Sequence, residues 1–110
     1  MNRTLTLRLT NTPGRNEVAR QAVIALAVKA GMPPLAADRA GSAVATAVAS
    51  CSDGDLSIEA SVDAEGAALA LIGGDDAWRH AAADGLRSYG AAADGDRVGL
   101  RLERTPLHPV

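Results

Sequence analysis

The sequence of 110 residues contains no phenylalanine, one tryptophan, one tyrosine and one cysteine. A single thiol, Cys51, excludes an internal disulfide, and no Cys or His lies near it at a zinc-binding spacing, so we expect a buried small side chain there. With so few aromatic residues, a composition that is 47% hydrophobic must build its core from Ala, Val, Leu and Ile. The length fits one domain over residues 1–104, followed by a flexible tail over 105–110.

The chain also lacks an excess of basic residues and a long apolar run. Its formal charge of −2 gives no electrostatic surface for phosphate backbones, so we expect no nucleic-acid partner. The first ten residues alternate between polar and apolar instead of forming the apolar stretch of a signal peptide or membrane anchor. We therefore expect a cytoplasmic protein with no membrane partner.

Hydrophobic spacing predicts the elements. Alternation indicates strands and a period near 3.6 indicates helices. Asn16 is expected to cap the first helix and Gly31 to end it, and Asp75 or Asp76 is expected to cap the third. The predicted order is a strand at 4–10, helices at 16–31 and 35–50, strands at 55–62 and 66–72, a helix from 75 or 76 with an apolar stripe reaching Tyr89, a mobile loop at 91–95, and a strand at 97–103.

This βααββαβ order predicts an α+β two-layer sandwich with helices on one face of a mixed or antiparallel sheet. A ferredoxin-like βαββαβ module with an extra helix is the alternative. The first helix has a narrow polar face, so a second helix or another protein should cover it on more than one side, and a homodimer is one way to do so.

The two helical runs, NEVARQAVIALAVKAGMPPLAADRAGSAVATAVAS, and the following GDLSIEASVDAEGAALALIGGD match the order of a known domain over about residues 4–76. The chain resembles the GHKL-type ATPase domain of anti-sigma-factor serine kinases and the related stress switch proteins. The resemblance implies a regulatory protein whose partner is a sigma factor or a STAS-type antagonist.

In that family the second helix carries a Glu and, four residues later, a magnesium-binding Asn. Here those positions are Thr46 and Ser50, or Ser42 and Thr46, and a hydroxyl is a poor magnesium ligand. The family's adenine-binding Asp is replaced by glycine or displaced, which leaves Gly73, Gly74 and Asp75 as remnant pocket positions. The resemblance thus implies a lost ATP site, with no cofactor and no catalytic residue. A strand end followed by a helix cap also explains the glycine pair.

Five side chains are candidate partner contacts. Arg8, Arg97 and Arg101 occupy outward positions of the first and last strands, and they would form a basic stripe if those strands pair; otherwise they lie on a solvated sheet face beside Glu59 and Glu103. Trp78 and Tyr89 share a helical stripe, either in the core or as exposed anchors.

His80, near Asp84, and His108 in the tail have no Ser or Cys at a catalytic spacing. Our hypothesis is a non-catalytic regulatory protein-binding module. The alternatives are a ferredoxin-like small-molecule sensor or dimerisation domain, and an ATP-dependent serine kinase of an anti-sigma antagonist.

Overall fold

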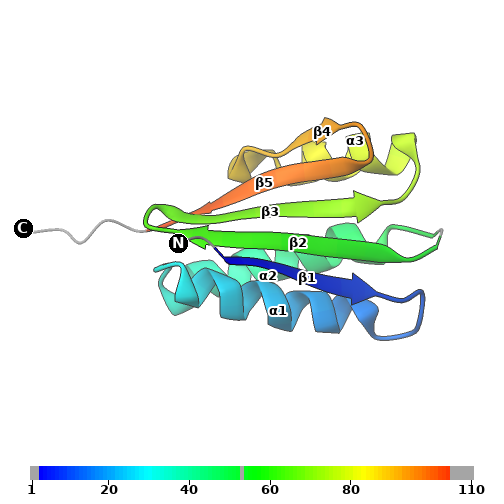
Figure 1. Cartoon of the computed structure of the whole chain (residues 1–110). Coiled ribbons are helices and arrows are strands. Elements are labelled where there is room, and N and C mark those ends of the chain that lie inside the picture. Colours follow the sequence, from blue (N-terminus) through cyan, green and yellow to red (C-terminus); the bar gives the residue numbers. More distant parts are fainter. Residues whose placement is uncertain (1–2, 53, 105–110) are drawn as a thin grey trace, which may run out of the picture.

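The computed structural model describes residues 3–52 and 54–104, and the predicted tail at 105–110 lies outside them. Within these described residues, three α-helices lie against one face of a five-stranded sheet (Figure 1), which confirms the predicted α+β class with two layers. Within the described ranges, no helix is long and apolar enough to cross a membrane. The elements are β1 (Arg3–Leu9), α1 (Arg15–Lys29), α2 (Pro34–Ala49), β2 (Leu56–Asp63), β3 (Gly66–Gly73), α3 (Asp76–Gly85), the 3-10 turn η1 (Arg87–Tyr89), β4 (Ala92–Asp94) and β5 (Arg97–Glu103).

The strand order is β1-β2-β3-β5-β4, and each neighbouring pair is antiparallel. One helix between two strands returns the chain so that the strands run parallel. Here two helices reverse the direction once more, so β2 runs antiparallel to β1 and pairs with it directly, with Leu5 opposite Ala60. This arrangement differs from the split βαβ units of a ferredoxin-like module.

Two boundaries near the C-terminal end differ from the prediction. The expected loop at 91–95 contains β4, which pairs with β5 around Gly95, a residue with φ of 62°. The third helix ends at Gly85, and Tyr89 lies in η1 and therefore not on the helical stripe of Trp78. A three-residue strand of small side chains has too little alternation to be recognised by its period.

The caps at the N-termini of α1 and α3 test two sequence predictions. The predicted cap at Asn16 is wrong, because α1 begins at Arg15 and is capped by Gly14, whose φ of 88° suits glycine. The carbonyl oxygen of Gly14 accepts from the backbone N–H groups of Glu17 and Val18. The cap at Asp75 is confirmed, since its Oδ1 accepts from the N–H of Trp78 at 2.7 Å.

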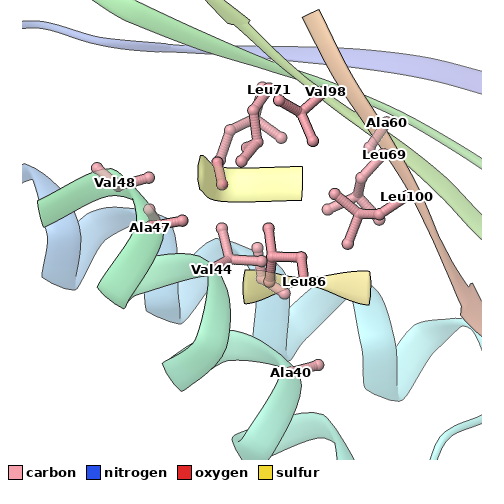
Figure 2. Close-up of a cluster of buried hydrophobic side chains, with 14 of the residues drawn as sticks. Ala40, Val44, Ala47, Val48, Ala60, Leu69, Leu71, Leu86, Val98 and Leu100 are labelled. Carbon is pink, nitrogen blue, oxygen red and sulfur yellow. The ribbon is translucent and has the colours of Figure 1, made fainter. Parts of the chain in front are cut away.

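The core lies between the sheet and the helices. Small residues bring α1 and α2 close together: a Cβ added to Gly41 would lie 2.6 Å from Cγ1 of Ile24. Figure 2 shows part of the cluster of buried side chains, in which Ala40, Val44, Ala47, Val48, Ala60, Leu69, Leu71, Leu86, Val98 and Leu100 are labelled.

Candidate functional site

Three of the remnant pocket positions, Thr46, Ser50 and Asp75, line a groove between α2 and α3. Two adjoining hollows of about 310 and 280 Å³ share Ser50 and Ala81. Thr46 and Ser50 line it from α2, and Asp75 lines it at the start of α3. The fold therefore brings Thr46, Ser50 and Asp75 together at this groove. Ser42 is exposed on α2, and neither it nor Gly73 nor Gly74 lines either hollow.

The hydroxyl groups of this groove bind the helix backbone. Thr46 donates to the carbonyl oxygen of Ser42 at 3.0 Å, and Ser50 donates to that of Ala47 at 2.7 Å. Such local bonds are common for Ser and Thr in helices, and each uses the one proton that the hydroxyl can donate. What remains is an acceptor oxygen at each position, which is far short of the ligand set that a magnesium ion takes.

Trp78 is the inner wall of the groove. Its indole N–H donates to the carbonyl oxygen of Ala47 at 2.9 Å and to Oγ of Ser50 at 3.2 Å, and the residue is only 8% exposed. Trp78 as an exposed partner anchor is therefore wrong, and core packing is confirmed. Tyr89 is half-buried and lines a separate hollow with Met32 and Arg101.

The glycine pair before α3 has a structural role. Gly73 and Gly74 have φ values of 120° and 68°, and a Cβ on Gly74 would overlap the ring of Trp78. Nη1 of Arg79 donates to the carbonyl oxygens of both glycines. With Asp75 serving as the cap of α3, a strand end followed by a helix cap is confirmed for this segment.

Metal-binding and nucleophilic groups are sparse. In the part of the chain that the structure describes, no three His, Cys, Asp or Glu side chains gather closely enough to hold a metal ion. His80 is exposed, and its Nδ1 lies 2.8 Å from the carbonyl oxygen of Asp76, not beside Asp84. Cys51 is buried, as expected.

Arg8, Arg97 and Arg101 do not form a basic stripe, because the first and last strands, whose pairing it required, are not neighbours. β1 and β5 are separated by β2 and β3, so Arg8 lies far along the sheet from Arg97 and Arg101. Each guanidinium also lies beside a carboxylate: Arg8 on Asp55 at 3.1 Å, Arg97 on Asp96 at 3.1 Å and on Glu59 at 3.4 Å, and Arg101 on Asp63 at 2.9 Å. The open sheet face thus carries paired charges rather than a basic surface.

Backbone hydrogen bonds and ion pairs lower the pKa values of two of these acids, Asp63 and Asp55. The backbone N–H of Glu65 and the guanidinium of Arg101 stabilise the charged carboxylate of Asp63, and they lower its pKa below the ordinary 3.8. The N–H of Asn11 and the guanidinium of Arg8 lower the pKa of Asp55 in the same way. Both acids are therefore charged at neutral pH.

A second surface lies at the other edge of the molecule, and we call it the β1–α1 surface. Its members are Leu5 and Leu7 of β1 with Val18, Ala22, Ala25 and Val28 of α1. Three of them are about half exposed: Leu5 at 51%, Val18 at 51% and Val28 at 48%. The narrow polar face of α1 indicated this surface in the sequence, but the alternation of β1 placed Leu5, with Leu7 and Leu9, on the face that was expected to be buried.

A hollow of about 320 Å³ lies within this surface, between the strand and the helix. It is lined by Leu5, Thr6, Leu7, Ala22, Ala25, Leu26, Lys29, Ile58 and Ala60. Its walls are mainly apolar, so it suits hydrocarbon side chains better than a charged ligand.

Comparison with known proteins gives no relative: no protein-family model matches this chain, and no curated protein does.

Proposed function

We propose that this chain is a non-catalytic regulatory module that binds another protein through its β1–α1 surface. The observation that carries the proposal is the apolar hollow between β1 and α1, which half-exposed Leu5 lines, together with the half-exposed Val18 and Val28 on the same helix. Contiguous apolar surface is costly in water, and covering it stabilises a complex by roughly 25 cal/mol per Å². The resemblance to anti-sigma factors and switch proteins supports a sigma factor or a STAS-type antagonist as the partner.

The α2–α3 groove supports a binding module over the alternative of an ATP-dependent kinase. The hydroxyls of Thr46 and Ser50 bond to their own helix, and Trp78 fills the interior beside them. Phosphate and magnesium need converging charged or amide groups. Calorimetric titration with ATP and magnesium should show no saturable heat, whereas micromolar binding would favour the kinase.

The arrangement of the strands counts against the second alternative, a ferredoxin-like sensor. A ferredoxin-like sensor relies on the split βαβ pattern, but β2 pairs directly and antiparallel with β1. The antiparallel pairing of β1 with β2 therefore counts against the ferredoxin-like sensor.

The protein-binding proposal is tested by purifying the chain from its own cells at native expression level. We expect the wild type to carry a different polypeptide in native mass spectrometry, and the double variant Val18→Asp/Val28→Asp to lose it. A matched double variant, Ser42→Asp/Ser88→Asp, places the same charges on exposed positions of α2 and η1 and should keep the partner. Retention of the partner by the first variant would contradict the proposal.

A further inference from the structure

The two edge strands of the sheet, β1 and β4, differ in length. β4 is three residues long, and short edge strands resist pairing with other chains. β1 is seven residues long, has no Pro or Lys, and pairs on one side only, with β2, within the described sheet. An edge of this kind offers a row of backbone N–H and C=O groups to an added strand.

The helix layer leaves space beside this edge. α1 runs along β1 (Figure 1), and the hollow of about 320 Å³ separates them. Ala22 and Ala25 line it from the helix side, and their short side chains leave the space unfilled. The exposure of the leucine side chains of β1 rises toward the start of the strand: Leu9 is 2% exposed, Leu7 is intermediate and Leu5 is 51% exposed.

A strand added beside β1 would meet this space with every second side chain. Successive residues of a strand point to opposite faces, so only alternate ones would face the helix layer. Those residues must be large and apolar to fill the hollow and to cover Leu5. Main-chain hydrogen bonds to the edge would supply affinity, and the hollow would supply selectivity.

Charge selects among such segments. Lys29 is the only charged residue that lines the hollow, and its ammonium has no ion-pair or hydrogen-bond partner within residues 3–52 and 54–104. An acidic residue at that end of the segment would pair with it. A second copy of β1 fits poorly, since its sequence RTLTLRL carries Arg3 and Arg8 and no acid.

We propose that β1 accepts, as a sixth strand, an extended segment of a different protein that has large apolar side chains at alternate positions and an acidic residue against Lys29. This inference rests on the proposed protein-binding function and specifies its mode and the chemistry of the partner. The sheet would continue across the interface with the apolar hollow closed.

The test uses labelled synthetic peptides and fluorescence anisotropy. The probe is Asp-Thr-Leu-Ser-Val-Thr-Leu-Ser-Asp, in which both terminal acids lie in phase with the apolar residues, so that an acid can face Lys29 in either strand direction. We expect saturable binding at least tenfold tighter than that of a peptide of the same composition with its apolar residues adjacent. A peptide with Lys in place of both Asp residues should bind as weakly as the peptide with adjacent apolar residues. The Lys29→Glu variant should instead bind the Lys peptide more tightly than the Asp peptide.

Backbone pairing is tested with N-methyl groups on every second residue of the probe. An added strand turns alternate N–H groups toward β1, so one phase of methylation should abolish binding and the other should preserve it. Equal effects of the two phases, or no reversal with Lys29→Glu, would overturn strand addition. A dimer of this chain that the probe dissociates would also overturn it, because the edge would then serve a second copy.

The outcomes separate this inference from the proposed function. Loss of the native partner in Val18→Asp/Val28→Asp together with no probe binding would retain the binding surface and reject strand addition. Probe binding with the native partner unaffected by those substitutions would reject the surface of the proposed function and retain an accepting edge.

Discussion

The indole N–H of Trp78 and the carbonyl oxygen of Ala47 form a 2.9 Å hydrogen bond across 31 residues of sequence. The carbonyl of Ala47 belongs to the last turn of α2, where carbonyl groups lack their usual helical partners. This carbonyl also accepts from the hydroxyl group and the backbone N–H of Ser50. The indole adds a donor from a different helix, and the bond therefore fixes α3 against α2.

Replacing Trp78 by Phe should lower the free energy of unfolding. The ring remains apolar, but the donor to Ala47 and Ser50 is lost. Because Ser50 still donates to the carbonyl of Ala47, the lost hydrogen bond costs about 0.5–1.5 kcal/mol, and the smaller ring adds a loss of packing. Urea unfolding followed by circular dichroism measures the change without relying on tryptophan emission. Trp78→Ala should cost more, about 3–5 kcal/mol, and equal midpoints for wild type and Trp78→Phe would show that the bond has no energetic role.

Gly74→Ala should be far more harmful than Gly95→Ala. Both glycines have similar positive φ values, 68° and 62°, so both substitutions carry the left-handed penalty of about 1–2 kcal/mol. Only at Gly74 would the new Cβ meet Trp78, whereas nothing lies within 4 Å at Gly95. We expect an additional loss of about 1–3 kcal/mol from overpacking at Gly74. Thermal denaturation compares the two, and equal losses would mean that Trp78 moves aside freely.

Arg15→Met should destabilise the connection between α1 and the segment after α2. Arg15 is 8% exposed, and its guanidinium donates to the carbonyl oxygens of Cys51 and of Gly54, the latter at 2.7 Å. Losing donors to these acceptors costs about 1–3 kcal/mol. The control Arg39→Met, at an exposed position of α2, should leave the midpoint of urea unfolding within experimental error. A similar result for both variants would contradict the role of Arg15.

Stability should fall in acid, in part through Asp63. The folded pKa of Asp63 lies below its unfolded value of 3.8, because the N–H of Glu65 and Arg101 bind the carboxylate. The contribution is therefore complete above that unfolded value and is lost as pH falls through the folded pKa. Asp63→Asn should reduce stability at pH 7 and flatten its decline below about pH 4. Denaturation curves across this range measure the slope, and an unchanged slope in the variant would exclude Asp63 as a contributor.

Much of the fold follows from local patterns. The period-2 spacing of residues 55–62 and 97–103 predicted β2 and β5. Asp75 was one of two predicted caps for α3, and its carboxylate accepts from the N–H of Trp78, three residues later. β4 escaped prediction because its pairing with β5 is set by the Gly95 turn, and its side chains show no alternation.

The candidate surfaces were less accessible to sequence reasoning. Alternation placed Leu5 and Leu9 on the same face of β1, but it could not tell that the helix layer covers Leu9 and leaves Leu5 half exposed. The same alternation placed Arg8, Arg97 and Arg101 on one face without revealing the carboxylates beside them. Both facts depend on strand order, which no local pattern contains.

Photo-crosslinking in the protein's own cells tests the central claim most directly. A benzophenone amino acid at Val18 should join the chain to a different protein, identified by mass spectrometry, while the same group at exposed Ser42 on α2 should give no such adduct. Crosslinks that form equally at Ser42, or none at Val18, would contradict a protein-binding surface on β1 and α1.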